Sequence, residues 1–175
     1  GIVDGRNVWR CDLRGALQAA AGLLSEPGEL VSRLNQQLCR DTLPSEFVTL
    51  LAIAISDDGR VLEYCNAGHE PLLRIRGRQV LVSEGGGLVL GVSPAERYET
   101  FRVELQPDDL VLLYTDGAVE ASNFAGELYG RDRLIKALQT NAKLELGTAL
   151  RAIQWDVRRF VGLAEQTDDL TFLGL

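Results

Sequence analysis

The sequence has few of the residues that metal sites and catalytic triads most often use. Its 175 residues include one histidine (His69) and three cysteines (Cys11, Cys39 and Cys65) without a CxxC pair. We therefore do not expect a histidine-based metal site or a histidine-dependent triad. The cysteine spacing is neither that of a zinc framework nor that of a disulfide scaffold, and it fits buried thiols in a reducing cytoplasm.

Long apolar runs and basic clusters are missing as well. No uninterrupted apolar stretch could span a bilayer, and the first residues show no signal peptide, so we expect a cytoplasmic protein without membrane insertion. The net charge is −7, and no Lys/Arg cluster indicates a nucleic-acid partner. Arg74, Arg76 and Arg78 alternate along a strand, which favours a solvated strand face over a site for a phosphorylated or acidic partner.

The composition is that of a globular chain. Hydrophobic residues make up 46% of the sequence and the mean hydropathy is zero, which favours a folded domain with a sizeable core over a disordered chain. We find no internal repeat, low-complexity segment or linker. The sequence therefore predicts a single domain over residues 1–175.

Helical patterns flank a central block of strand patterns. Residues 13–24 predict a helix, and Leu30, Leu34 and Leu38 predict a second helix that Ser25 can cap. Strand patterns follow, beginning with a largely buried strand over 47–55 and a tight turn at 57–59. The other strand candidates are 1–7, 61–65, 71–75, 80–82, 88–92, 98–105, 110–114 and 170–175, with helices over 134–138 and 146–161 before the last. This order predicts an α+β fold with helices on the outer faces of antiparallel sheets.

Acidic residues stand at the ends of two predicted strands that are far apart in the sequence. Asp116 and Gly117 follow the strand over 110–114, whereas Asp168 and Asp169 precede the last strand. Asp-Gly after a strand is often only a turn. Aspartates brought together by folding would instead suit Mg²⁺ or Mn²⁺, and two such ions about 3.5–4 Å apart can clamp a phosphate.

Several motifs resemble one protein family. Residues 114–117 (YTDG) with 120–121 (EA) resemble the YTDG-x-x-E-A motif of the SpoIIE-like branch of the PPM metal-dependent Ser/Thr protein phosphatases, the bacterial sporulation and stress-response type. Residues 168–171 (DDLT) resemble its closing motif, and 66–71 (NAGHEP) resemble its NAGH-x-P turn. The motifs occur in the family order, and the match extends from about Ser25 to the end of the chain.

The resemblance implies an α-β-β-α sandwich with a two-metal centre that holds two Mn²⁺ or Mg²⁺ ions. Asp116 and Asp168 would be ligands, with Asp169 the second choice, and metal-bound water rather than a side chain would carry the catalysis. His69 would be a structural turn residue. The implied function is removal of phosphate from Ser or Thr of a regulatory protein, such as an anti-sigma-factor antagonist.

The family also implies a wider architecture. Its members are often output domains at the C-terminal end of a longer signalling protein, behind an N-terminal sensor or receiver domain, and they dimerise through helices there. We therefore expect a phosphorylated regulatory protein as partner, with a possible homodimer, and no nucleic acid.

The start of the sequence departs from the family pattern. The family's opening GGD-type hairpin has no counterpart, and in an ungapped register Ile2 stands where the GDVSGHG motif has its ligand aspartate. A second register gives Asp4 as an acidic ligand and Gly5 as a carbonyl ligand. A third treats residues 4–6 as only a turn, which leaves the N-terminal part of the domain incomplete.

These registers imply different functions. Two carboxylates instead of three would leave more positive charge uncompensated, so a second ion would bind weakly. The alternative function is then a pseudophosphatase, which acts as a protein-binding regulatory module.

Overall fold

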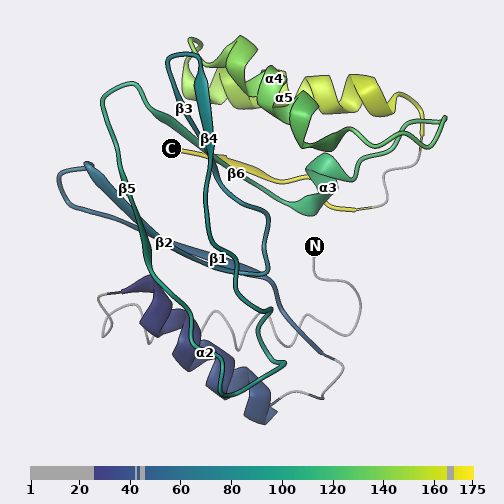
Figure 1. Ribbon diagram of the computed structural model, residues 1–175. Coiled ribbons are helices and arrows are strands. Elements are labelled where there is room, and N and C mark those ends of the chain that lie inside the picture. The colour runs from purple at the N-terminus through teal and green to yellow at the C-terminus, as the bar shows by residue number, and fades with distance from the viewer. Residues whose placement is uncertain (1–25, 42, 44–45, 165–167) are drawn as a thin grey trace. The chain divides into compact units, whose positions relative to one another are not determined.

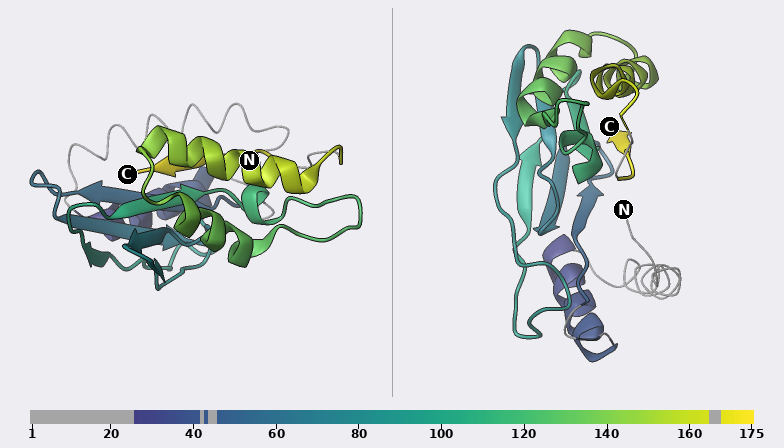
Figure 2. Two further views of the ribbon diagram at one scale, coloured as in Figure 1. Left: turned by 90° about the horizontal axis from the view of Figure 1, so that it is seen from above. Right: turned by 90° about the vertical axis from the view of Figure 1, so that its right-hand side faces the viewer.

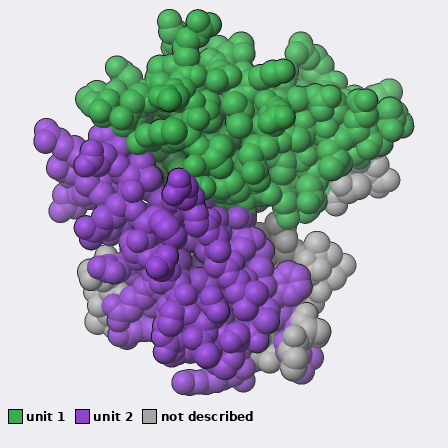
Figure 3. Space-filling view, in the orientation of Figure 1, with its two compact units in different colours: residues 1, 70–83, 106–175 green, residues 2–69, 84–105 purple. Residues whose placement is uncertain are grey.

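The computed structural model describes residues 26–41, 43, 46–164 and 168–175 (Figure 1). The predicted strand over 1–7, the predicted helix over 13–24 and its neighbour Ser25 lie outside the described residues. The chain divides into two compact units (Figure 3). One contains Glu70–Ser83 and Gln106–Leu175, and we call it the C-terminal unit. The other, the N-terminal unit, contains the described residues up to His69 together with Glu84–Leu105. The single domain over residues 1–175 stays a prediction.

A helix packs on a three-stranded antiparallel sheet in the N-terminal unit. The leucine spacing correctly predicted the helix α2 (Pro27–Asp41), which buries Val31, Leu34 and Leu38. The sheet has the order β1-β2-β5, and its strands are β1 (Leu50–Ile55), β2 (Val61–Ala67) and β5 (Phe101–Glu104). Buried Cys65, Ala67 and Leu90 join α2 in the core of this unit.

The predicted hairpin between β1 and β2 is confirmed, but the predicted burial of its first strand is wrong. Gly59 has a φ of +68° in the turn, where a glycine avoids steric strain. The strand begins at Leu50 rather than Phe47, and it is half-buried to exposed along its length. Among the described residues, β1 pairs only with β2. The strand predicted over 88–92 forms only an isolated bridge between Val48 and Leu90.

The C-terminal unit has a four-stranded antiparallel sheet of order β4-β3-β6-β7. Its strands are β3 (Leu73–Arg76), β4 (Gln79–Val82), β6 (Leu110–Tyr114) and β7 (Phe172–Gly174). The one-turn helix α3 (Asp116–Val119) follows β6, and α4 (Gly130–Asn141) and α5 (Leu146–Val161) cover the sheet (Figures 1 and 2). Both predicted helices are therefore present, and α4 is longer than its predicted core.

Burial explains why β6 lies inside this sheet. Leu112 and Val111 are almost completely buried, and β6 is bonded to β3 on one side and to β7 on the other.

Arg76 of β3 donates two hydrogen bonds to the buried carboxylate of Asp109, at 2.8 and 2.7 Å, and these bonds lower the pKa of Asp109. Arg76 thus neutralises a buried acid of its own unit instead of lying on a solvated strand face, and Arg78 lies in the turn after β3.

The predicted α+β class with antiparallel sheets and packed helices is confirmed. In the described part of the chain, no helix has the length and apolarity that crossing a membrane would require.

Replacing Asn35 in α2 should destabilise the fold. Asn35 is fully buried; its amide donates to the carbonyl of Ser93 at 2.7 Å, and its Oδ1 accepts from the N–H of Gly91 at 3.0 Å. Asn35→Ala leaves both backbone groups unsatisfied, so we expect a loss of about 1–3 kcal/mol in the free energy of unfolding. Urea unfolding measures it, with Gln37→Ala on the exposed side of the same helix as control. Equal losses in the two variants would contradict this account.

Candidate metal centre

The two acid-bearing segments lie next to each other at one end of the C-terminal sheet. Tyr114, the last residue of β6, pairs with Phe172, the first of β7. The pairing continues one residue further, where the N–H of Thr115 donates to the carbonyl of Thr171 at 3.3 Å and the N–H of Thr171 donates to Thr115 Oγ1 at 3.1 Å. Asp116 follows this pair on one strand, and the DD sequence precedes it on the other.

Gly117 brings the main chains of these two segments into contact. A Cβ atom at this position would lie 2.5 Å from the carbonyl oxygen of Asp169 and 3.0 Å from its carbonyl carbon. Thr115 Oγ1 donates to the same carbonyl oxygen at 2.8 Å. The sequence pattern suggested only a turn at this glycine. In the structure, its missing side chain makes room for the segment that carries the second acid.

The three described acids differ in their surroundings. Asp116 begins α3 and is exposed; its Oδ1 accepts from the N–H of Gly117 at 2.9 Å. Its Oδ2 accepts no hydrogen bond from any described residue. Asp168 is half-buried, and its Oδ1 accepts from the N–H of Asp169 at 2.7 Å. The side chain of Asp169 is exposed, and its carbonyl is held by Thr115.

The donor set fits a hard divalent ion but is small. Aspartate carboxylates are the ligands that Mg²⁺ and Mn²⁺ prefer, and Asp116 and Asp168 come from adjacent segments. Within the described ranges, no group of three His, Cys, Asp or Glu side chains could hold a metal. Asp4 and Gly5, the other predicted ligands, lie outside the described residues.

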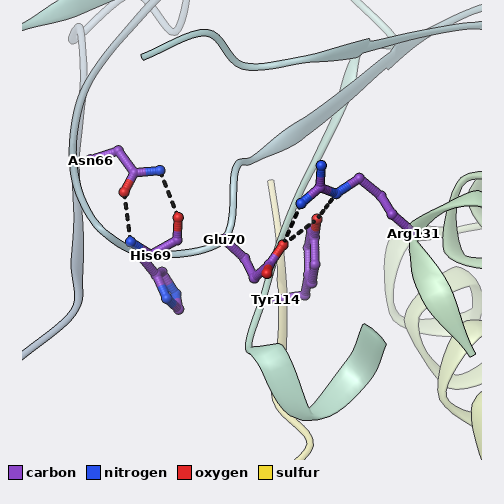
Figure 4. A network of polar contacts seen from close by, with 5 residues as sticks. All are labelled: Asn66, His69, Glu70, Tyr114 and Arg131. Carbon is purple, nitrogen blue, oxygen red and sulfur yellow. Dashed lines mark hydrogen bonds and ion pairs between the residues drawn. The ribbon is translucent and has the colours of Figure 1, made fainter. Parts of the chain in front are cut away.

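A polar network that the sequence did not reveal anchors the end of β6 (Figure 4). Tyr114 Oη donates to Glu70 Oε2 at 3.2 Å. Arg131, in the first turn of α4, donates to Tyr114 Oη at 3.2 Å and to Glu70 Oε2 at 2.9 Å. Burial, followed by the charge of Glu70, raises the pKa of Tyr114 to about 12. The hydrogen bond to Glu70 raises the pKa of Arg131. The network ties β6 to α4 two residues before Asp116.

In the N-terminal unit, the turn of the NAGH sequence is closed by Asn66. Its Oδ1 accepts from the N–H of His69 at 2.8 Å, and its Nδ2 donates to the carbonyl of His69 at 2.9 Å (Figure 4). Gly68 adopts a φ of +71° between them. These contacts use the main chain of His69, in line with its interpretation as a turn residue.

Comparison with known sequences gives one family. The sequence model of Stage II sporulation protein E (SpoIIE) matches residues 11–175. Protein IcfG of Synechocystis sp. is 30% identical over 138 residues, which is 74% of this chain and 20% of that protein. Phosphoserine phosphatase RsbU of Bacillus subtilis is 29% identical over 104 residues, 58% of this chain and 31% of that protein. The chain thus matches less than a third of the length of either relative.

Solved structures share the fold. The SiaA-PP2C domain of Pseudomonas aeruginosa matches with a TM-score of 0.80 and 21% identity, over 95% of this chain and 65% of that chain. The PP2C phosphatase domain of SpoIIE from Bacillus subtilis, with a fragment of its regulatory domain, matches with a TM-score of 0.74 and 17% identity, over 93% and 47%. These likenesses confirm the predicted phosphatase-like fold.

Adding one methyl group at Gly117 should disturb the acid-bearing turn. Gly117→Ala places its Cβ against the main chain of Asp169, which must move, so we expect a loss of about 1–3 kcal/mol in the free energy of unfolding. Chemical denaturation measures this loss. Gly86→Ala is the matched control, because a Cβ there meets nothing within 4 Å. A Gly117→Ala variant as stable as this control would disprove the close contact.

The Tyr114 network should make stability fall at alkaline pH. The folded-state pKa of Tyr114, about 12, lies above its ordinary value of 10.0. The resulting stabilisation is therefore complete below pH 10 and is lost as the pH rises towards 12. Tyr114→Phe should cost about 1 kcal/mol at neutral pH through the lost hydrogen bonds, and its stability should fall less steeply above pH 10. The free energies of unfolding of both proteins, measured between pH 10 and 12, test this prediction. An equal fall with pH in the two proteins would contradict it.

Proposed function

Because the chain belongs to the SpoIIE-like branch of the PPM phosphatases, we propose that it hydrolyses phosphoserine or phosphothreonine in a regulatory protein, with bound Mn²⁺ or Mg²⁺. The observation that carries this proposal is the meeting of the Asp116 and Asp168 segments across the β6–β7 pair. The name of the relative RsbU, a phosphoserine phosphatase, agrees with the substrate class.

The acids of this centre can take part in binding a phosphate group only if a cation is bound between them. Asp116, Asp168 and Asp169 repel a phosphate group, which is itself negatively charged. We propose Asp116 and Asp168 as ligands, with Asp169 the second choice, and Asp4 and the carbonyl of Gly5 as completing ligands for two ions. A divalent ion there would supply charge neutralisation of the phosphate and activation of water.

The remaining residues of the centre hold the ligands in place. Thr115 fixes the main chain at Asp169 and Thr171, Gly117 allows the close approach, and the Glu70–Tyr114–Arg131 network positions the end of β6. Among the described residues of this arrangement there is no serine, cysteine or histidine nucleophile. We therefore propose direct hydrolysis by water without a phosphoenzyme.

The chain would act as the output domain of a signalling protein. It matches only a fifth of IcfG and under a third of RsbU, and one structural neighbour contains a fragment of a regulatory domain. We propose an N-terminal sensor or receiver domain, a cytoplasmic location, a possible homodimer and a phosphorylated anti-sigma-factor antagonist as the substrate type. The alternative is a pseudophosphatase, which Ile2 in the ungapped register favours.

Replacing either proposed ligand should strongly reduce metal-dependent turnover. We expect Asp116→Asn and Asp168→Asn each to lower kcat at least about 100-fold, since the charge of the donor set is reduced. Release of phosphate from an aryl phosphate and from a phosphoserine protein, with Mn²⁺ or a chelator, measures this. Calorimetric Mn²⁺ titration should show weaker binding in both variants.

Asp57→Asn is the control for charge. Asp57 is exposed in the β1–β2 turn, outside the candidate centre, and its replacement should leave turnover and Mn²⁺ binding unchanged. Turnover that survives both a chelator and Asp116→Asn contradicts the metal mechanism. Mn²⁺ binding without turnover on any phosphoprotein favours the pseudophosphatase.

A further inference from the structure

A groove runs between α4 and α5 in the C-terminal unit. It has a volume of about 920 Å³ and is lined by residues from both helices. The opposite faces of these helices, with Leu134 and Leu138 on α4 and Ile153 on α5, are buried in the core. The groove residues that matter here are Arg133, Lys136, Trp155, Asp156, Arg158 and Arg159.

Trp155 gives this groove an exposed aromatic surface. Its exposed fraction is 68%, while Ile153 and Val157 on the same helix are 0% and 1% exposed. A tryptophan offers a large, rigid contact area, and aromatic side chains are typical anchors of protein interfaces. Its outward position therefore suits contact with another molecule.

The groove is positively charged in an acidic chain. Its lining contains four cations (Arg133, Lys136, Arg158 and Arg159) and one acid (Asp156), which gives +3, whereas the whole chain carries −7. Lys136 and Arg158 are exposed and form no ion pair with any described residue. The groove's acid, Asp156, is already engaged, since it accepts from Tyr129 Oη at 2.7 Å and from Arg159 at 2.9 Å.

The geometry favours several separate carboxylates over one phosphate. Arg133 donates to the carbonyls of Leu128 and Tyr129 at 2.7 and 3.1 Å, and it lies 4.6 Å from the ring centroid of Phe160. Arg159 is held by Asp156. The two cations left, Lys136 and Arg158, come from different helices. Only one of the two is an arginine, which could hold a phosphate through two parallel N–H groups, whereas single cations on two helices beside an aromatic side chain suit an extended acidic segment.

We propose that the α4–α5 groove is a docking site for a carboxylate-rich segment of a partner protein. The acidic side chains of that segment face Lys136 and Arg158, and one large apolar side chain packs on Trp155. The net charge of −7 opposes a long polyanion such as nucleic acid more strongly than it opposes a short acidic segment. Recruitment through this groove does not depend on the proposed catalytic activity.

Fluorescence anisotropy tests the proposal with the 175-residue chain. The probe is a short fluorescein-labelled peptide of glutamates around a central leucine. We expect saturable binding that weakens with salt, and affinity that falls about fivefold in Lys136→Ser/Arg158→Ser because two charge pairs are lost. Trp155→Ser should weaken binding without any change in charge, and it supplies a second test if the double variant does not fold.

Matched controls separate the groove from general charge. Lys143→Ser/Arg151→Ser removes two cations that do not line the groove, and it should change affinity less than about twofold. The same peptide with glutamine in place of glutamate should not bind. Equal weakening by the two double variants overturns the proposal, as does unchanged binding by the Trp155 variant.

Competing ligands give the remaining outcomes. A peptide with a single phosphoserine, a single-stranded oligonucleotide or an anionic vesicle that binds more tightly than the glutamate peptide overturns the assignment to a carboxylate-rich segment. Because every readout is binding, a catalytically inactive chain with an intact groove would still confirm the proposal.

Discussion

The contact between Gly117 and the main chain of Asp169 is the constraint on which the candidate centre depends. A Cβ at position 117 would lie 2.5 Å from a carbonyl oxygen, closer than real Cβ contacts come. Backbone atoms cannot turn away as a long side chain can. Thr115 strengthens the contact by bonding that carbonyl and the N–H of Thr171. These contacts hold two carboxylate-bearing segments side by side, although about fifty residues of chain separate them.

The C-terminal sheet makes this relation rigid. β6 lies between β3 and β7, and Leu112 at its centre is fully buried. Its last residue, Tyr114, is bonded to Glu70 and Arg131, so the strand cannot shift along its axis without breaking a charged network. Hydrophobic burial thus fixes the strand, and polar contacts fix the place where it ends.

Local patterns predicted the parts of this structure that local physics determines. The helix spacing found α2, α4 and α5, and the apolar run found β6, because each element buries a face that the sequence shows directly. The burial of β1 and the pairing of residues 88–92 were predicted less well, since both depend on neighbours far away in the chain. The four-residue helix α3 was not foreseen, because it is too short to show a period.

The same limit applies to the candidate centre. The motifs indicated that Asp116 and Asp168 belong together, and the structure places their segments side by side. Glu70 and Arg131 were missed because a network between distant side chains leaves no periodic signal.

The charge of the chain affects how an acidic partner could approach it. A centre of aspartates in a chain of net charge −7 would slow the approach of an acidic phosphoprotein. Seven cations lie scattered over residues 130–162, so the sequence showed no basic cluster there. Folding nevertheless places four of them along one groove. Such a surface attracts acidic segments at short range, where screening by salt is weakest. In the C-terminal unit, the proposed metal centre would thus lie at the acidic end of the sheet, and the proposed docking site for an acidic segment on the α4–α5 face.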